Sequence, residues 1–206
     1  LIGQLLERGY TIASIRELFD AWEKGQGLAH VLGLDEAIRG TAQPEAVATL
    51  GFDELQAIFK NRVSRSPMHR MAYSRDWSPR QRNAQDLPDL VVIPHSTDEV
   101  VQLVQIALKY NLPVTPFAGG TGMGGGVAAW KGGIMVETKG FNQIHEIDVE
   151  NFSVTVGTGI TLWTLNEQLA RHGLWLPHQP DSKRACTVGA SIGCDNDSTF
   201  GIRYGK

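Results

Sequence analysis

The sequence predicts an α+β fold, in which a helical N-terminal segment precedes a domain of alternating strands and helices. Two observations predict it. Before residue 60, apolar residues recur at the three- and four-residue spacing of helices. After residue 88, short β-branched runs alternate with helical repeats, and a hairpin pattern follows them. We therefore divide the chain into a helical segment at 1–60, a basic connector at 61–87 and a folded domain at 88–206.

The N-terminal segment is expected to hold two helices. The first, "TIASIRELFDAWEKG", has Thr11 and Ser14 as alternative caps and Gly25 as its stop. The second is "FDELQAIFK", which repeats apolar residues at the same spacing.

The connector is rich in arginine and has no clear period. Between Lys60 and Arg82, seven lysine and arginine residues stand against one acid, Asp76. We expect irregular structure there, either as a solvated connector or as a binding surface for nucleic acid, an acidic partner or an anionic substrate. Its aromatic residues are limited to Tyr73 and Trp77, which argues against a single-strand-binding platform.

The domain at 88–206 begins with a β-α-β pattern, which favours a parallel crossover. "DLVVIP" and "PVTPFA" are typical of buried strands, and "STDEVVQLVQIALKYN" between them has helical spacing behind a capping box of Ser96 and Glu99. "GGIMVET" predicts a third strand. "IHEIDVENFSVTVGTGI" predicts a hairpin that turns at "ENF", and "TLWTLNEQLARHG" predicts a helix that ends at Gly173.

Six of the eleven residues in "PFAGGTGMGGG" (116–126) are glycine, and this run directly follows a predicted strand. It matches G-x-G-x-x-G at Gly120, Gly122 and Gly125, but a Rossmann loop must open a helix. Only "VAAWKGG" separates the run from the strand "IMVET", and no GK[ST] ends it as in a Walker A loop. Two interpretations remain: a mobile turn between strands, or a loop whose successive N–H groups bind an anion.

A second segment of small and polar residues runs from 178 to 205, "HQPDSKRACTVGASIGCDNDSTFGIRYG". Its glycine, alanine and serine residues allow close approach of the backbone, and its polar side chains supply hydrogen-bonding groups. A long cofactor with a diphosphate in its middle would fit between the two segments.

In order, "LVVIPHSTDEV", "LPVTPFAGGTGMGGG", "GGIMVET", "LPHQPDS", "TVGASIGC" and "RYG" resemble the FAD-binding domain of the vanillyl-alcohol oxidase type, also called the PCMH type. The chain is most similar to the branch of FAD-linked oxidases that holds the glycolate oxidase FAD subunit, D-lactate dehydrogenases and alkyldihydroxyacetonephosphate synthase. The resemblance covers residues 73–206. It implies a small α/β subdomain and the start of a second one, truncated at its C-terminal end. We therefore expect an N-terminal fragment, with the family's remaining flavin-binding strands and substrate domain beyond Lys206.

The resemblance implies FAD as the cofactor. In the family the glycine-rich loop wraps the FAD pyrophosphate with backbone N–H groups, and the later segment runs along the ribityl and isoalloxazine side. The matching positions are Phe117, Ala118, Gly119, Gly120, Thr121, Gly122, Met123 and Gly126 in the loop, and Pro180, Asp181, Ser182, Thr187, Gly189, Ser191, Gly193 and Asn196 in the later segment. Relatives that attach FAD covalently have R-x-G-G-H in the loop, whereas this chain has Thr121, so we expect non-covalent FAD. Relatives commonly have "TNAGG" where this chain has "CDNDST", a departure from the family pattern.

The resemblance also implies an activity, namely an FAD-dependent oxidoreductase that oxidises a 2-hydroxy acid such as D-lactate or glycolate by hydride transfer to flavin. Two alternatives stay open: a transferase similar to alkyldihydroxyacetonephosphate synthase, without net oxidation, and a truncated or accessory flavin-binding domain without catalysis. No catalytic residue is assigned, because the family's usual catalytic histidine would follow Lys206, and residues 1–206 alone are expected to be inactive. His178, beside the expected flavin, and Arg75, as a partner for a substrate carboxylate, are the residues to test first. The electron acceptor and any homo- or hetero-oligomer stay open.

Composition excludes several other classes of protein. The formal net charge of −3 gives no whole-protein reason to expect nucleic acid as a partner. Neither the six histidines nor Cys186 and Cys194 show metal-ligand spacing, so we expect free thiols and no metal site. No apolar run approaches the ~20 residues that span a bilayer, and the N-terminus lacks the features of a signal peptide. These features predict a cytoplasmic protein, peripheral to a membrane at most.

Overall fold

The structure, a computed structural model, describes residues 44–79 and 87–205 of the 206-residue chain. The chain divides into two units, Leu1–Ala42 and Gln43–Lys206, and every described residue belongs to the second unit. The helix expected at residues 11–25 lies outside the described residues.

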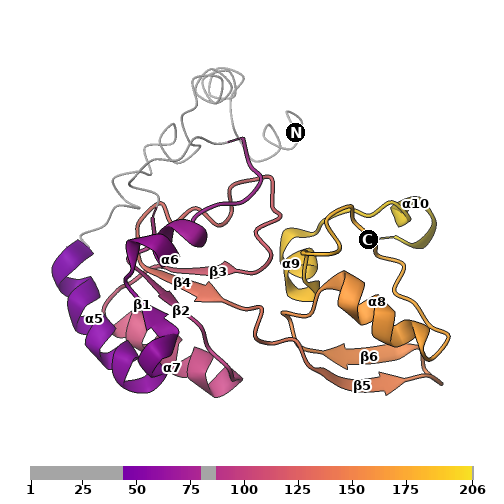
Figure 1. The fold of residues 1–206 in the computed structure, drawn as a ribbon, viewed down its shortest axis with the longest axis horizontal. Coiled ribbons are helices and arrows are strands. Elements are labelled where there is room, and N and C mark those ends of the chain that lie inside the picture. The colour runs from indigo at the N-terminus through magenta and orange to yellow at the C-terminus, as the bar shows by residue number, and fades with distance from the viewer. Residues whose placement is uncertain (1–43, 80–86, 206) are drawn as a thin grey trace, which may run out of the picture. The chain divides into compact units, whose positions relative to one another are not determined.

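A four-stranded sheet organises the first part of this second unit (Figure 1). Its strands are β1 (Val63–Ser64), β2 (Leu90–Val92), β3 (Val114–Phe117) and β4 (Ile134–Glu137), in the spatial order β1-β2-β4-β3. Strands β2 and β3 both run parallel to β4, whereas β1 pairs antiparallel with β2. The predicted β-α-β pattern is therefore present, with β4 inserted between its two strands.

Strand β2 is apolar on both of its faces, and helices pack against one of them. Leu90 and Val92 pack with α5 (Pro44–Phe59) and α7 (Thr97–Lys109), while Val91 packs on the other face with Met135. Side chains alternate between the faces of a strand, so a strand buried on both faces has a continuous apolar run. The predicted helix at "FDELQAIFK" forms the second half of α5, which contributes to this same core.

The connector is more ordered than its composition indicates, which corrects the expectation of irregular structure. It contains a 3-10 turn, η1 (Lys60–Arg62), then β1, then α6 (Pro67–Ala72). A two-residue strand and a six-residue helix are too short for their periodicity to be recognised. Strand β1 is defined by its pairing with β2. Helix α6 can begin with a proline because the N–H that proline lacks would have no partner within the first turn of a helix.

Strand β3 was expected to be buried, and this was wrong. It is an edge strand, in which Val114 is 40% exposed and Pro116 is exposed, while Phe117 at its end is buried. Proline lacks the N–H that an inner strand must donate, so an edge position accommodates it.

The capping box expected at the start of α7 is confirmed in its first half. The hydroxyl of Ser96 accepts the N–H of Glu99 at 3.2 Å. The carboxylate of Glu99, however, binds the guanidinium of Arg62 through two hydrogen bonds of 2.6 Å and accepts the N–H of His95 at 2.7 Å. Hydrogen bonding to Arg62, more than any other cause, lowers the pKa of Glu99 to about 2. This ion pair fastens the connector to the start of α7.

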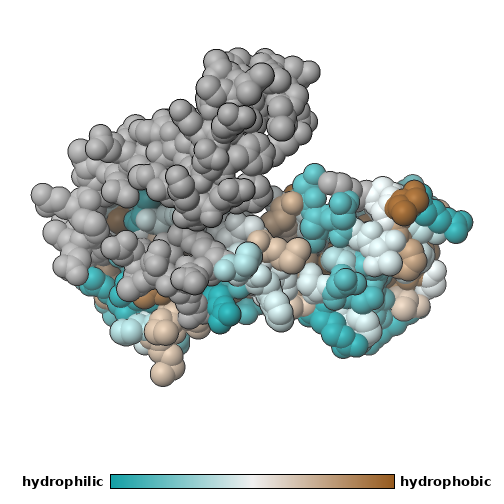
Figure 2. Space-filling model, turned by 90° about the horizontal axis from the view of Figure 1, so that it is seen from above, coloured by the Kyte–Doolittle hydropathy of each residue, from teal (hydrophilic) through white to brown (hydrophobic). Residues whose placement is uncertain are grey.

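The second part of the unit begins with the predicted hairpin, β5 (Ile144–Asp148) and β6 (Ser153–Val156). It continues with α8 (Leu162–Ala170), α9 (Val188–Cys194) and the short α10 (Gly201–Tyr204). Leu165 and Leu169 of α8 pack with Ile160 and with the apolar face of the hairpin. Figure 2 shows hydrophilic and hydrophobic residues interspersed over the visible surface of the described part.

Candidate functional site

The glycine-rich loop leaves the edge strand β3 at its carboxyl end, after Phe117. No helix forms between this loop and β4 in the described chain, as expected from the rejection of the Rossmann interpretation. In open sheets with parallel strands, ligands bind outside the carboxyl ends of the strands, and this loop occupies such a position.

The backbone of the loop offers a run of hydrogen-bond donors. Among residues 44–79 and 87–205, no acceptor takes the N–H groups of Ala118 to Gly124. The next N–H, of Gly125, donates to the buried carboxylate of Asp76 at 3.0 Å. Gly120 has φ +64, which a residue with a side chain adopts only with strain. A loop with several consecutive free N–H groups is suited to an anion.

Contacts with the later segment explain the glycine at position 119. A Cβ atom built on Gly119 would overlap the backbone carbonyl of Ala185, so only glycine permits this approach. The two segments expected to hold one cofactor therefore lie against each other at this point. The sequence analysis expected these two segments to share a cofactor on the basis of composition and resemblance alone.

Aromatic and acidic residues support the base of the loop. The ring of Tyr73 lies edge-on to that of Phe117, with 5.1 Å between the centroids. Burial, then the charge of Glu137, raises the pKa of Tyr73 above its ordinary value, so the phenol remains protonated. Glu137 is buried at the end of β4 and accepts the N–H of Lys139 at 3.1 Å.

The later segment is held by a hydrogen-bonded chain of side chains. Thr187 is fully buried and caps α9 by accepting the N–H of Ala190. The thiol of Cys186 lies 3.3 Å from the hydroxyl of Ser191 and accepts from the amide of Asn196 at 3.7 Å. Both cysteines are free, as expected. The hydroxyl of Ser191 thus already has a partner within the protein, the thiol of Cys186.

His178 joins this chain at one end. Its Nε2 lies 2.8 Å from Oδ1 of Asn196, and a carboxamide oxygen can only accept, so Nε2 carries the proton. The other ring nitrogen, Nδ1, is buried without a partner among the described residues, and so is the hydroxyl of Ser198. Buried polar atoms without partners are rare, which indicates a ligand or water at this place.

The predicted cofactor residues of the glycine-rich loop differ in their surroundings. Ala118 to Gly122 form one continuous, half-buried backbone stretch. Met123 is 78% exposed, and a Cβ at Gly126 or Gly193 would meet nothing within 4 Å. Gly189 approaches Thr158, whose carbonyl accepts its N–H at 2.8 Å. Packing within the protein already accounts for the glycine at position 189.

The remaining predicted positions lie along the segment before α9. Pro180 is buried, Asp181 is exposed, and Ser182 accepts the N–H groups of Ala185 and Cys186 through its carbonyl. This turn carries the Ala185 carbonyl that contacts the loop.

Asp76 is the functional candidate that the sequence analysis missed. It appeared only as the single acid within the basic connector. The structure buries it beneath the glycine-rich loop at 6% exposure. Its isolation among basic residues was the one available signal. Arg75, the candidate for a substrate carboxylate, is exposed, and its carbonyl lies 3.2 Å from a Cβ built on Gly120.

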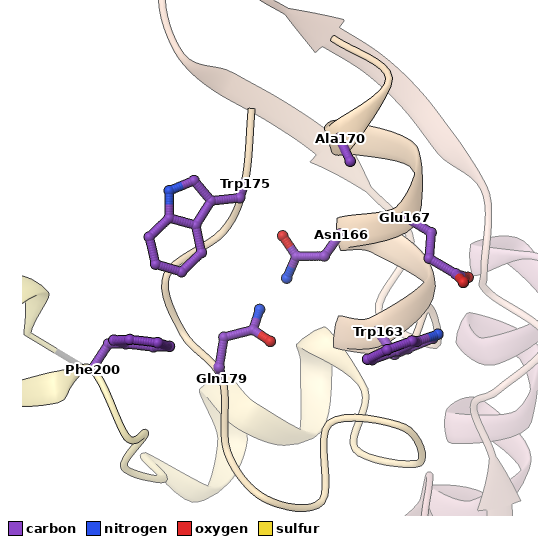
Figure 3. A pocket seen from close by; sticks show the side chains of 7 residues that line it. All are labelled: Trp163, Asn166, Glu167, Ala170, Trp175, Gln179 and Phe200. Carbon is purple, nitrogen blue, oxygen red and sulfur yellow. The ribbon is translucent and has the colours of Figure 1, made fainter. Parts of the chain in front are cut away.

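A separate, open and largely apolar pocket of about 360 Å³ lies beside α8 (Figure 3). Its lining residues come from α8, from the irregular stretch after it and from the segment before α10: Trp163, Asn166, Glu167, Ala170, Trp175, Gln179 and Phe200. None of them belongs to the glycine-rich loop. The face of Trp163 carries the guanidinium of Arg184 at 3.8 Å, a cation–π contact.

Taken together, the residues fit a ligand with a diphosphate. The loop offers free N–H donors, and the glycine at position 119 lets the later segment approach the loop closely. Two buried polar atoms of the later segment have no hydrogen-bond partner among the described residues. Among the residues that the structure describes, no helix has both the length and the apolar character needed to cross a membrane.

Comparison with known proteins matches residues 88–206 to the FAD binding domain family. The chain is 33% identical to the glycolate oxidase subunit GlcD of Bacillus subtilis (strain 168) over 136 residues, which cover 66% of this chain and 28% of that protein. It is 39% identical to the probable mitochondrial D-lactate dehydrogenase of Danio rerio over 119 residues, which cover 57% of this chain and 23% of that protein. The chain thus spans less than a third of the length of either relative.

Solved structures show the same fold. An alkyldihydroxyacetonephosphate synthase structure superposes with a TM-score of 0.70 at 26% identity, covering 77% of this chain and 31% of that chain. A p-cresol methylhydroxylase structure shares the fold with a TM-score of 0.63 at 20% identity, covering 72% of this chain and 30% of that chain.

Proposed function

This chain belongs to the FAD binding domain family, and from that premise we propose that it is the flavin-binding part of an oxidoreductase that oxidises a 2-hydroxy acid such as D-lactate or glycolate. The expected PCMH-type fold and the FAD cofactor are confirmed by the family match and by the structural neighbours. The substrate, the site residues and the reaction of the complete protein belong to the proposal.

The free N–H groups from Ala118 to Gly124 carry the proposal for the site. A diphosphate presents several charged oxygens, and each hydrogen bond to a charged group contributes on the order of 1.5–3 kcal/mol. A few such bonds hold a dinucleotide without a covalent link. Thr121 stands where covalently flavinylated relatives have histidine, so the bond to protein that a histidine would make is not available here.

When bound, FAD supplies the hydride acceptor, and the protein supplies binding, orientation and exclusion of water. Gly119 lets the turn at Ala185 close against the loop, which places the later segment beside the same ligand. Asn196 accepts the proton of Nε2 of His178, which leaves the buried Nδ1 as an acceptor for a donor of the ligand. Ribityl hydroxyls and flavin N–H groups are donors of the kind that such an acceptor requires.

The similarity to a glycolate oxidase subunit and to a D-lactate dehydrogenase supports the 2-hydroxy acid as the substrate class. A second candidate is a flavin-dependent transferase reaction of the alkyldihydroxyacetonephosphate synthase kind. One observation favours it: the alignment with the Trypanosoma brucei brucei synthase covers 83% of this chain, at 28% identity. The fold is common to both, so the two candidates differ only in chemistry.

Anaerobic mixing of the complete protein, loaded with FAD, with 2-hydroxy acids tests the proposal. Loss of the yellow flavin colour on addition of D-lactate or glycolate, but not of L-lactate as the control for D-lactate, is the expected result. Flavin that stays oxidised with every 2-hydroxy acid would reject the oxidation and leave the transferase reaction. A purified protein that takes up no FAD would reject the site itself.

A further inference from the structure

We propose that Asp76 is a positioning residue for FAD: its carboxylate holds the glycine-rich loop in the shape that leaves the N–H groups of Ala118 to Gly124 free for the diphosphate. This inference rests on the proposed function, because it concerns the same cofactor. It adds a residue that precedes the matched family region, residues 88–206.

The first step is the pattern of hydrogen bonds around Asp76. One carboxylate oxygen accepts the buried N–H of Gly125 at 3.0 Å, and the other accepts the N–H of Ser78 at 2.9 Å. Between them in sequence, the N–H of Trp77 donates to the carbonyl of Gly122 at 2.8 Å. The segment 76–78 is therefore tied to the loop at two places.

The second step is what these bonds do to the loop. They fix Gly122 and Gly125, so the stretch before them is bounded by Phe117 at one end and by the Asp76 contacts at the other. A Cβ on Gly122 would lie 3.3 Å from the carboxylate, so even alanine at this position would crowd Asp76. An anchored loop binds its ligand without the entropic cost of ordering the backbone at that moment.

The third step is why the residue is an aspartate. Two N–H groups point to two different oxygens, and a carboxylate has two acceptor oxygens where a carboxamide has one. The negative charge itself opposes a diphosphate by Coulomb repulsion. Any gain in affinity from Asp76 must therefore come through the geometry of the loop.

Asp89 provides a matched control. Its carboxylate accepts the N–H of Gly133 at 2.7 Å, so it too fastens a glycine-containing turn to a strand. That turn precedes β4 and is separate from residues 118–126. Loss of either carboxylate removes a similar bond, but only loss of Asp76 releases the proposed diphosphate loop.

The test compares Asp76→Ala and Asp89→Ala in the complete protein. FAD affinity is measured by the quenching of FAD fluorescence, at a temperature where both variants are folded. Amide hydrogen exchange is followed in peptides that cover residues 118–126. We expect Asp76→Ala to weaken FAD binding by about tenfold or more, since a lost bond to a charged group is worth this factor. We expect faster exchange in the loop of this variant alone. Asp76→Asn, which keeps one acceptor oxygen, should fall between it and the wild type, and it serves as the second variant if Asp76→Ala does not fold.

Two results would overturn the inference: FAD affinity of Asp76→Ala equal to wild type, or an equal loss of affinity in Asp89→Ala. Failure of the proposed function would look different. In that case the wild-type protein would bind no FAD, while hydrogen exchange would still decide whether Asp76 holds the loop.

Discussion

Gly119 and Ala185 lie in direct backbone contact, 66 residues apart in sequence, with no room for a side chain between them. This contact joins the glycine-rich loop to the segment before α9. It makes the fit between the two segments sensitive to a single methyl group.

Gly119→Ala is therefore expected to destabilise the protein by about 1–3 kcal/mol, because a Cβ would overlap a backbone carbonyl that cannot rotate away. FAD affinity should fall with it. Gly201→Ala is the matched control, since a Cβ there meets nothing within 4 Å, the residue is not at positive φ and it lies outside the glycine-rich loop. Thermal unfolding and FAD titration of both variants provide the measurements. Equal behaviour of the two would contradict the contact.

Gly120→Asp is expected to abolish FAD binding. Gly120 has φ +64, and a Cβ would lie 2.9 Å from the ring of Phe117, so any side chain costs about 1–2 kcal/mol in backbone strain. The carboxylate would in addition repel the diphosphate. Gly120→Ala carries the strain without the charge, so a larger loss of affinity in the aspartate variant isolates the electrostatic part. FAD affinity unchanged in Gly120→Asp would show that this loop does not hold phosphate.

Bound FAD is expected to be non-covalent, because Thr121 cannot form the link that histidine forms in flavinylated relatives. Acid precipitation of the yellow complete protein should leave the flavin in the supernatant. Colour that remains in the pellet after washing would disprove this prediction.

Stability should depend on pH through Glu99. Arg62 lowers the folded-state pKa of Glu99 from 4.5 to about 2, so the ion pair stabilises the fold above pH 4.5 and loses this effect as the pH falls towards 2. The side chains of Arg62 and Glu99 are 23% and 21% exposed, so solvent screening reduces the effect, to about 1–2 kcal/mol.

Denaturant unfolding of wild type and Glu99→Gln at decreasing pH measures this. The difference in the free energy of unfolding should be largest at neutral pH and shrink between pH 4.5 and 2. Asp98→Asn removes a charge from the same helical turn without removing the ion pair, and serves as the control. A difference that is independent of pH would exclude the Glu99 carboxylate as its source.

The longer elements could be predicted from the sequence because their periods extend over enough residues. The thirteen residues of α7 show their helical repeat and their serine cap, and the first three residues of β4 are apolar because the strand is buried. Strand β1, with two residues, and α6, with six, carry no recognisable period. The exposed position of β3 also escaped prediction, because β4 follows it in sequence but lies inside the sheet.

The candidate site divides in the same way. The glycine-rich loop was recognised because its glycines are consecutive or nearly so in the sequence. Asp76 was not, because its partner Gly125 lies 49 residues further along the chain, and no local pattern marks an acceptor for a distant N–H.

The sequence by itself determined the α+β class, the main helices and strands, the glycine-rich loop after the edge strand and the flavin family. These properties depend on local conformation and on ordered motifs, which a chain carries before it folds. Only the tertiary structure decided that β4 separates β2 from β3, that Ala185 closes on Gly119, and that Asp76 lies beneath the loop. Those relationships join residues far apart in sequence, and they arise only when burial and hydrogen bonding in the completed fold bring these residues together.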